Sequence, residues 1–396
     1  MRGLGHAGSF VERLQPLDRL APLSDEERRR YSRQLILPGA GEAAQRRLKA
    51  ARVLVIGAGG LGSPVLEYLA AAGVGTLGIV DDDRVDESNL QRQVIHGVDR
   101  IGELKVTSAA QTVARINPLV TVEAHAVRLD RDNALGLFTE YDLVVDGADN
   151  FATRYLVADA AEITGRAVVW GSILRYEGQV SVFGIGAGYR DLFPEPPEPG
   201  AVPSCAEGGV FGVLPGMIGT MMAGEAIKLI TGIGAPLIDR VQVLDAAAGR
   251  WRELRLAADP DRARTRELEP DYVELCGTPG AARGTSVTVQ QLQSLLQRRA
   301  AGELDFELVD VREPDEFDLV HIPGARLLPL DRLQSEVRGH AFEVPDDRDV
   351  ILVCKTGARS TRALEMLRDS GRTNVRQVVG GTMGWVQTVD PSLPRY

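Results

Sequence analysis

The chain of 396 residues is too long for one ordinary domain and fits two or three domains of about 100–200 residues each. Its 44% hydrophobic and 25% charged residues are close to the average of globular proteins, which excludes wholesale disorder, collagen-like repeats and a coiled coil. A formal net charge of −10 opposes sequence-independent binding to nucleic acid or to anionic lipid. Because aromatic residues make up only 5%, we expect layers of helix and sheet with aliphatic cores.

Cysteine use and hydrophobic segments bear on the cellular compartment. The three cysteines, Cys205, Cys276 and Cys354, lie far apart and never form a C-x-x-C pair, which is typical of a reducing compartment. The N-terminus lacks the apolar stretch of a secretory signal, and the longest apolar segment, 210–230, is interrupted by charged residues. We therefore expect a cytoplasmic protein in which that segment is a buried helix, with neither membrane nor nucleic acid as a partner.

The N-terminal region predicts one short helix. Residues 1–23 have the composition of a weakly ordered segment. Ser24 and Glu27 then form a capping box, in which each side chain accepts a hydrogen bond from the other residue's backbone N–H. This pattern predicts a helix that begins after Ser24 and runs through Arg33.

A strand, a glycine-rich loop and a helix follow one another directly. The apolar run 52–56 ends in the glycines of 57–62, and 63–72 has helical composition. Two further strands, 76–80 and 141–145, end in acidic residues. The pattern predicts an α/β fold with a doubly wound parallel sheet, whose ligand crevice lies at the carboxyl ends of these strands.

Two proline-containing stretches divide the chain. The segment 191–203 holds five prolines and predicts an extended loop that leads to Cys205. The charged segment 257–284 has no sustained apolar period and predicts an interdomain linker. The resulting domains are a first unit at 24–256 and a second at 285–396.

The second unit predicts a smaller α/β domain. Helical patterns cover 287–299 and 359–369, and short apolar strands cover 307–310 and 350–353. Cys354 comes directly after the second of these strands and before the second helix.

The glycine loop supplies the first chemical signal. Gly57, Gly59 and Gly62 satisfy G-x-G-x-x-G, a pattern in which backbone N–H groups approach phosphates at a helix N-terminus. Asp81, at the end of the next strand, is placed to accept hydrogen bonds from ribose hydroxyls. Alone, these residues fit a nicotinamide dehydrogenase or a tight turn equally well.

Charged residues downstream favour nucleotide activation, because hydride transfer needs no groups that neutralise a triphosphate. Over roughly residues 24–256 the chain resembles the molybdopterin-synthase and thiamine-pathway adenylyltransferases, bacterial relatives of ubiquitin-activating enzymes. The motifs that carry the resemblance are YSRQLIL at 31–37, GAGGLGS at 57–63, SNLQRQ at 88–93, GELK at 102–105, DGADN at 146–150 and PSCAEGG at 203–209.

The resemblance implies a Rossmann-like adenylating domain that uses ATP and Mg²⁺ on the C-terminal Gly-Gly tail of a ubiquitin-like sulfur-carrier protein. The residues implied at the nucleotide are Gly57, Gly59, Gly60, Gly62, Asp81, Asn89, Arg92, Gln93 and Lys105, with Asp149 near magnesium and Arg33 entering the neighbouring site of a homodimer. A carboxylate that attacks an anionic α-phosphate meets charge repulsion, which Arg92 and Lys105 would relieve as catalytic groups. The alternative is that both form ordinary surface salt bridges.

The resemblance raises two further questions, namely whether this chain binds zinc and whether Cys205 is reactive. Relatives often hold zinc through two C-x-x-C pairs, but this chain has Gly188–Asp191 at the first position and Val273–Cys276 at the second. One thiol cannot build a tetrahedral zinc site, so we expect no zinc. Cys205 stands where some relatives form a covalent link to the carrier, and its alternative role is that of a buried, inert cysteine.

The second chemical signal is a loop that joins a strand to a helix. Its residues are Cys354, Lys355, Thr356, Gly357, Ala358, Arg359 and Ser360. Successive N–H groups and the helix N-terminus form an anion-binding nest, to which Lys355 and Arg359 add positive charge, so we expect a stabilised thiolate or persulfide at Cys354.

From about residue 285 to the C-terminus the chain resembles rhodanese-type sulfurtransferases. The matching motifs are DVRE at 310–313, HIPGA at 321–325, CKTGARS at 354–360 and GGTMGW at 380–385. The loop length fits members that carry a persulfide and not the related phosphatases. We expect structural roles for His321, in its turn, and for Arg312, in an ion pair.

Together the two units predict a reaction sequence. The first adenylates the carrier, and the second delivers sulfur from a Cys354 persulfide to give a carrier thiocarboxylate. Thiosulfate and the persulfide of a cysteine desulfurase are the expected sulfur donors. Two alternatives remain: a thioester-forming enzyme that uses Cys205, and a non-catalytic scaffold that binds the carrier. The sequence leaves open whether the carrier serves molybdenum-cofactor, thiamine or cysteine formation.

Overall fold

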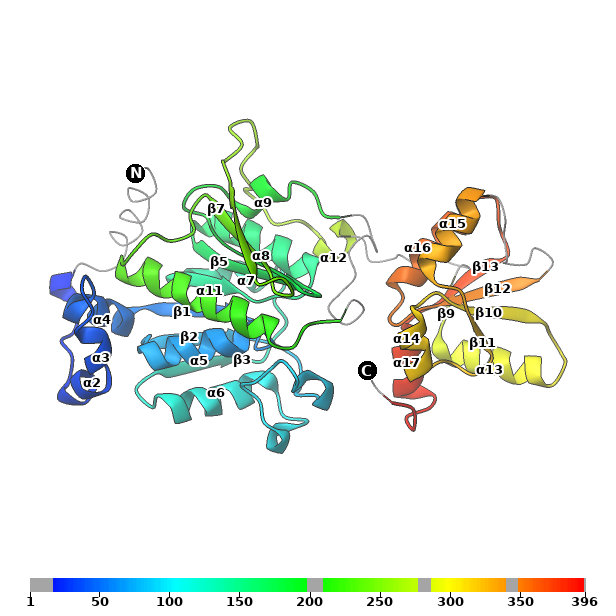
Figure 1. The fold of residues 1–396 in the computed structure, drawn as a ribbon, viewed down its shortest axis with the longest axis horizontal. Helices are drawn as coiled ribbons and strands as arrows, with labels where there is room; N and C mark the ends of the chain where they lie inside the picture. The colour runs from blue at the N-terminus through cyan, green and yellow to red at the C-terminus, as the bar shows by residue number, and fades with distance from the viewer. Residues whose placement is uncertain (1–16, 198–208, 277–285, 340–347, 395–396) are drawn as a thin grey trace. The chain divides into compact units, whose positions relative to one another are not determined.

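The computed structural model describes residues 17–197, 209–276, 286–339 and 348–394, which fold into two units (Figure 1). The first unit includes the chain through Tyr272, and the second contains the chain from Val273 onward. None of the helices in the described ranges is long and apolar enough to cross a membrane.

An eight-stranded sheet forms the centre of the first unit, in the order β3-β2-β1-β4-β5-β6-β7-β8. Its strands are β1 (Arg52–Ile56), β2 (Thr76–Val80), β3 (Thr121–His125), β4 (Leu143–Asp146), β5 (Ala167–Leu174), β6 (Glu177–Phe183), β7 (Arg240–Asp245) and β8 (Arg250–Arg255). The strands from β3 to β5 pair in parallel, which confirms the predicted doubly wound sheet, whereas β6, β7 and β8 add an antiparallel extension. Because the reversal of order falls beside β1, the carboxyl ends of β1, β2 and β4 meet at one edge.

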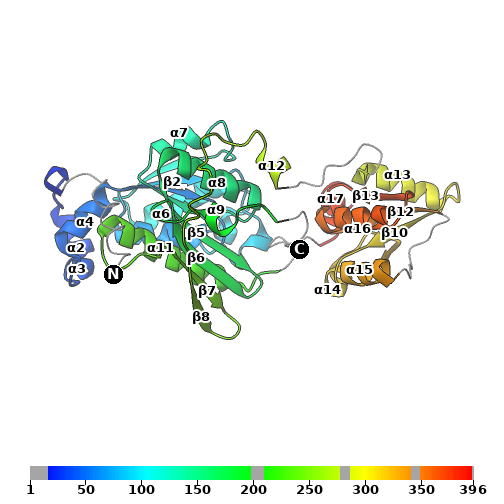
Figure 2. The ribbon, with the colours of Figure 1, turned by 90° about the horizontal axis from the view of Figure 1, so that it is seen from above.

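Helices cover both faces of this sheet (Figures 1 and 2). The α-helices are α2 (Asp25–Arg30), α3 (Ser32–Leu35), α4 (Gly41–Ala50), α5 (Gly62–Ala72), α6 (Lys105–Ile116), α7 (Ala134–Thr139), α8 (Phe151–Thr164), α9 (Tyr189–Leu192), α11 (Leu214–Thr231) and α12 (Tyr272–Leu275). Helices α5, α6 and α11 pack on one face, and α7 and α8 lie on the other. The apolar segment predicted as a buried helix is α11, whose side chains join the main core.

The predicted N-terminal helix is correct at its start and wrong at its end. The capping box is present, because Glu27 N–H donates to Ser24 Oγ (3.2 Å) and Ser24 N–H donates to Glu27 Oε2 (2.6 Å). The helix does not continue through Arg33, since Tyr31 leaves the helical conformation between α2 and α3. Tyr31 is buried, and its hydroxyl accepts a hydrogen bond from Asn117, so a tertiary contact interrupts the helix.

The second unit has a five-stranded parallel sheet in the order β11-β10-β12-β13-β9. Its elements are β9 (Ser286–Val287), α13 (Val289–Ala300), β10 (Phe306–Asp310), α14 (Pro314–Leu319), β11 (Ala325–Leu327), α15 (Leu330–Gly339), β12 (Asp349–Val353), α16 (Ala358–Asp369), β13 (Val375–Val378) and α17 (Gly381–Thr388). One core lies between the sheet and helices α15 and α16, and another lies beneath α13 and α17. Cys354 follows the central strand, β12, as the sequence predicts.

The predicted linker differs from the structure over part of its length. Residues 259–272 do not leave the first unit but bond to α8 and α9, for example through Arg262 and Tyr272. The charged residues of this segment predicted an exposed linker. In the structure, its arginines form ion pairs with acidic residues that are distant in the sequence, such as Glu162 and Asp191. The proline-rich segment likewise begins inside α9, and its residues 198–203 lie outside the described ranges.

Candidate functional site

The glycine loop between β1 and α5 has a conformation that requires glycine. Gly57 has φ +87°, a left-handed value that other residues rarely adopt. A Cβ at Gly62 would lie 1.9 Å from the carbonyl oxygen of Gly57, so this position packs the helix against the loop. Gly59 and Gly60 face the adjoining cleft.

A cleft of about 380 Å³ lies at the carboxyl ends of β1, β2 and β4. The predicted site residues that line it are Gly57, Gly59, Gly60, Asp81, Arg92, Gln93, Lys105 and Asp149. The structure does not bring Gly62, Asn89 or Arg33 into this lining. Gly62 packs behind the loop, Asn89 ends a short 3-10 helix, and Arg33 is exposed on α3. The cleft is the candidate nucleotide site.

Two cations face this cleft. Lys105 is the first residue of α6 and is only 5% exposed, and its Nζ lies 2.8 Å from Oδ2 of Asp83. Burial argues against an ordinary surface salt bridge at Lys105. Arg92 is half-buried, and its guanidinium donates to the carbonyl oxygen of Ser88 at 3.2 Å. Both groups provide positive charge beside the glycine loop.

Asp81 accepts a hydrogen bond from the backbone of the glycine loop. Its Oδ2 accepts a hydrogen bond from Ala58 N–H at 2.8 Å, and its Oδ1 accepts one from Asp83 N–H at 2.9 Å. Burial raises the pKa of Asp81. The sequence predicts a ribose contact for this residue, and the structure adds a role in positioning the loop.

Sequence reasoning missed His96, which contacts the carbonyl group of the same residue, Ala58. His96 Nε2 lies 2.9 Å from the carbonyl oxygen of Ala58, and Nδ1 lies 2.8 Å from Oγ of Ser108. Burial lowers the pKa of His96, which favours the neutral ring. Because the Ala58 oxygen only accepts, Nε2 carries the proton and Nδ1 accepts from Ser108. No local pattern marks this residue, since its partners lie 38 and 12 positions away.

Sequence reasoning also assigned no role to Asp146 or Arg154, which both bond to Ala148 just after β4. Asp146 is buried and accepts a hydrogen bond from Ala148 N–H at 2.9 Å, and burial raises its pKa to about 6. Arg154 donates to the carbonyl oxygen of Ala148 at 3.2 Å and lines the cleft. Both residues therefore shape the loop that carries Asp149.

The donor set of the cleft fits a magnesium-bound nucleotide. Gln93 is 5% exposed, and its Oε1 has no hydrogen-bond partner among the described residues, so a ligand donor would satisfy it. Carboxylate oxygens of Asp81, Asp82 and Asp83 lie within 4.8 Å of one another, and the exposed Asp149 lies in the same lining. Such oxygen ligands suit Mg²⁺.

The second candidate site surrounds Cys354, which is fully buried at the end of β12. Gly357 N–H donates to Sγ at 3.1 Å, and Oγ of Ser360 lies 3.5 Å from Sγ. Gly357 has φ +129°, so the loop needs glycine there to turn its amide toward the sulfur. This contact supports the predicted anion-binding loop.

The charges of the loop differ from the expectation. Lys355 is buried, but both guanidinium nitrogens of Arg359 bond to the carboxylate of Glu316 on α14, at 2.6 and 2.8 Å. Burial alone raises the pKa of Glu316, but the hydrogen bonds from Arg359 outweigh it and lower the pKa. Glu316 therefore offsets the positive charge that Arg359 was expected to supply.

Two other motif residues of this unit have structural contacts. The Arg312 guanidinium and the Asp310 carboxylate are both fully buried and form a bidentate ion pair. The ring of His321 stacks on Phe317 with centroids 4.1 Å apart, and its Nδ1 lies 3.0 Å from the carbonyl oxygen of Phe317.

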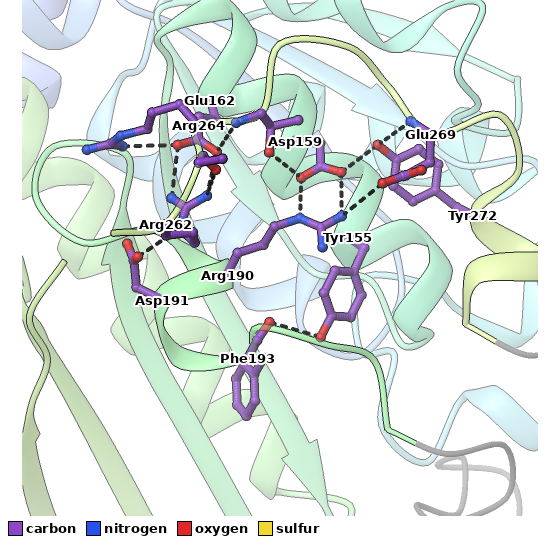
Figure 3. Close-up of polar contacts among 12 residues, drawn as sticks. Tyr155, Asp159, Glu162, Arg190, Asp191, Phe193, Arg262, Arg264, Glu269 and Tyr272 are labelled. Carbon is purple, nitrogen blue, oxygen red and sulfur yellow. Dashed lines mark hydrogen bonds and ion pairs between the residues drawn. The ribbon is translucent and has the colours of Figure 1, made fainter. Parts of the chain in front are cut away.

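The donor set at the predicted zinc position does not fit zinc (Figure 3). Asp191, in the first predicted position, accepts hydrogen bonds from Arg262 Nε at 2.8 Å and from Asp259 N–H at 3.2 Å. The partners of Asp191 outside its own turn thus come from 259–262. A guanidinium here repels a dication, and zinc prefers thiolate or imidazole ligands. Cys205 lies outside the described residues.

Comparisons with known proteins identify both units. Residues 31–265 match the model of the ThiF family, and residues 288–388 match that of the rhodanese-like domain. The chain is 50% identical to "Probable adenylyltransferase/sulfurtransferase MoeZ" of Mycobacterium tuberculosis, over 94% of this chain and 96% of that protein. It is 51% identical to "Sulfur carrier protein adenylyltransferase" of Thermus thermophilus, over 64% and 97% of the two chains, respectively. It is also 39% identical to "Adenylyltransferase and sulfurtransferase MOCS3" of Bos taurus, over 97% and 90%.

Solved structures share the fold of the first unit. The crystal structure of E. coli MccB with ATP superposes with a TM-score of 0.53 at 20% identity, and the match covers 60% of this chain and 74% of that one.

Proposed function

Because the chain belongs to the ThiF family and carries a rhodanese-like domain, it is an adenylyltransferase and sulfurtransferase, and we propose that its two sites act in succession on one sulfur-carrier protein. The observation that supports this proposal is the presence of both sites in one chain: a nucleotide cleft with Lys105 and Arg92, and a loop that holds Cys354.

The first step forms an acyl adenylate. A carboxylate oxygen of the carrier's terminal glycine attacks the α-phosphorus of ATP, and the bond to the bridging oxygen breaks with release of pyrophosphate. Lys105 and Arg92 neutralise charge as the two anions approach, and the amides of the glycine loop bind phosphate oxygens. Asp83, which is exposed, releases Lys105 to the nucleotide. Asp149 or the carboxylates of 81–83 would hold Mg²⁺, which would supply further neutralisation of the phosphate charge.

The second step transfers sulfur. Cys354 first takes a sulfane sulfur from a donor such as thiosulfate, with release of sulfite, or from the persulfide of a cysteine desulfurase. The terminal persulfide sulfur then attacks the acyl carbon of the adenylate, AMP leaves, and an acyl disulfide joins the carrier to Cys354. A cellular thiol attacks the Cys354 sulfur, which releases the carrier thiocarboxylate and leaves a mixed disulfide that a second thiol reduces. The amide of Gly357 stabilises negative sulfur before and after transfer.

A homodimer accounts for the predicted role of Arg33. This residue is exposed on α3 and has no hydrogen-bond or ion-pair partner in the described part of the chain. Its neighbours Ile36 and Leu37 are 70% and 55% exposed, which gives this surface apolar character. We propose that a second copy covers this surface and receives Arg33.

The proposal is tested with purified protein, candidate carriers, ATP, magnesium, thiosulfate and a thiol reductant. The expected product is a carrier in which sulfur replaces one terminal oxygen, detected by mass spectrometry. ATP–pyrophosphate exchange measures the first step alone. A protein that catalyses no exchange with any Gly-Gly carrier contradicts the proposal, even when its rhodanese activity is intact.

A Cys205→Ala variant separates the thioester alternative. Full thiocarboxylate formation by this variant excludes an obligatory thioester at Cys205, whereas its loss, with pyrophosphate exchange intact, supports one.

A further inference from the structure

Ion pairs and hydrogen bonds of side chains join the segment 259–272, most of whose residues are exposed, to the first unit (Figure 3). Its contacts reach α8, which supplies Asp159 and Glu162, and α9, which supplies Arg190 and Asp191. We call the following set the arginine clip: Asp159, Glu162, Arg190, Asp191, Arg262, Thr265 and Tyr272.

One half of the clip surrounds Asp159, whose side chain is 1% exposed. Arg190 binds both of its carboxylate oxygens, at 2.6 and 2.7 Å. From the segment, the Tyr272 hydroxyl donates to Oδ2 at 2.7 Å, and the Thr265 hydroxyl donates to Oδ1 at 3.3 Å. The segment therefore adds two hydrogen bonds to a buried carboxylate that Arg190 of α9 already binds.

The other half centres on Arg262. Its guanidinium donates to both oxygens of Glu162, at 2.9 and 3.1 Å, and its Nε donates to Asp191 at 2.8 Å. Thr265 N–H also donates to Glu162, at 3.2 Å. Burial alone raises the pKa of Glu162, but the hydrogen bonds, led by that of Arg262, outweigh it and lower the pKa to about 2.

Burial separates this network from an ordinary surface ion pair. Exposed pairs contribute little to stability, whereas removal of one partner from a buried pair leaves an uncompensated charge. Asp191 is 1% exposed, and Arg262 and Glu162 are 15% and 16% exposed. Arg264 binds the same Glu162 at 3.0 Å but is 62% exposed. The segment thus contains one buried and one exposed arginine on the same carboxylate.

We propose that the arginine clip takes the place of a metal centre as the cross-link that fastens residues 259–272 to α8 and α9, through Arg262, Thr265 and Tyr272. Its three carboxylates, Asp159, Glu162 and Asp191, each bond to the guanidinium of Arg190 or Arg262 at 2.6–3.1 Å, so cations already occupy the positions that a dication would take. The more exposed Glu269 lies 4.0 Å from Arg190. This inference concerns the fold and is independent of the proposed reaction.

The clip also determines where the connection to the second unit starts. With the clip closed, the thirteen residues 273–285 join Tyr272 to β9 and span at most about 45 Å. With the clip open, the connection starts near Leu256, and its maximum span is about 100 Å. The clip therefore limits the reach of the sulfurtransferase unit.

Hydrogen exchange of the full-length protein tests the clip, with Arg262→Met and Arg264→Met as a matched pair. We expect amides of 259–272 to exchange at least tenfold faster in the Arg262 variant and less than threefold faster in the Arg264 variant. Amides of β1 and β12 report whether each unit remains folded. Equal exchange of the segment in the two variants overturns the proposal.

A milder variant and a chelator complete the test. Tyr272→Phe removes one hydrogen bond to Asp159, and we expect it to speed exchange of the segment severalfold, which keeps the proposal testable when Arg262→Met fails to fold. Exchange at the wild-type rate in this variant contradicts the proposal. EDTA is expected to leave the segment of the wild-type protein protected, and stoichiometric zinc together with opening by EDTA would overturn the clip as the cross-link.

Discussion

The two reaction sites differ in how many parts of the chain build them. The nucleotide cleft combines residues from the glycine loop, from 81–83, from 92–93, from the start of α6 and from the loop after β4. The sulfur site is centred on seven consecutive residues, 354–360, and its partners outside the loop include Glu316, Gln377 and Thr382. A site formed by a single loop is encoded locally, whereas a cleft requires the correct order of the sheet.

Both sites contain a cation that is paired with a carboxylate, but the carboxylates differ in exposure. Asp83, the partner of Lys105, is 68% exposed, so water can solvate it when Lys105 turns to the nucleotide. Glu316, the partner of Arg359, is 14% exposed and has no comparable access to water. We therefore expect Lys105 to exchange partners during the reaction and Arg359 to stay with Glu316.

The largest effect is expected at the sulfur site. Cys354→Ala removes the thiol of the loop, so sulfur transfer should fall at least about 1000-fold, while ATP–pyrophosphate exchange changes less than about twofold. The control is Cys276→Ala, which should leave both activities unchanged. Residual thiocarboxylate formation near the wild-type rate would show that sulfur reaches the carrier without Cys354.

The next effect is expected in the cleft. Lys105→Met removes a buried positive charge that lines the candidate nucleotide cleft, so kcat for ATP–pyrophosphate exchange should fall about 100-fold. Arg115→Met, an exposed change on the same helix, is the control and should have little effect. Similar rates in the two variants would indicate that Lys105 only forms a structural ion pair with Asp83.

His96→Ala removes the donor to the Ala58 carbonyl and so loosens the glycine loop. An unsatisfied buried acceptor costs about 1–3 kcal/mol, so we expect the KM for ATP to rise about tenfold, with a smaller change in kcat. His125→Ala is the control from the same unit. An unchanged KM, measured by initial rates of pyrophosphate exchange, would contradict a positioning role for His96.

A smaller effect is expected from Glu316→Gln, which leaves the charge of Arg359 unbalanced beside Cys354. Because thiosulfate is a dianion, its KM should fall roughly threefold with kcat nearly unchanged, as measured by sulfur transfer to cyanide. Glu365→Gln, an exposed change on α16, controls for net charge. A fall in kcat without a change in KM would indicate that the ion pair only holds the loop.

The smallest effect is a pH dependence of stability. Despite burial, hydrogen bonds from Arg262 and its neighbours lower the pKa of Glu162 in the folded protein to about 2, from its ordinary value of about 4.5. The ionised form is favoured in the folded state, so its contribution is full above pH 4.5 and is lost as the pH falls toward 2. Urea unfolding of wild type and Arg262→Met across this range should differ less at low pH than at pH 7. A constant difference would contradict the assignment.

Local patterns in the sequence predicted most of the elements that carry the chemistry. The capping box at Ser24, the strand–loop–helix around Gly57 and the loop after Cys354 depend on residues adjacent in the chain, and the structure contains all three. The family resemblance added Lys105, because no local pattern in the sequence places this residue near the glycine loop.

Only the tertiary structure decided the features that depend on distant partners. Tyr31 interrupts the predicted helix through a contact with Asn117, 86 residues away, and His96 contacts Ala58, 38 residues away. Arg262 lies in a segment whose composition predicts a linker, but in the fold it bonds to Glu162, which is 100 residues earlier in the chain. The sequence by itself determined the local conformations and the reactive loops, because hydrophobic periodicity, caps and glycines act over a few residues. The partners of its charges were decided by the packing of α8 and α9, because an ion pair depends on distance in space.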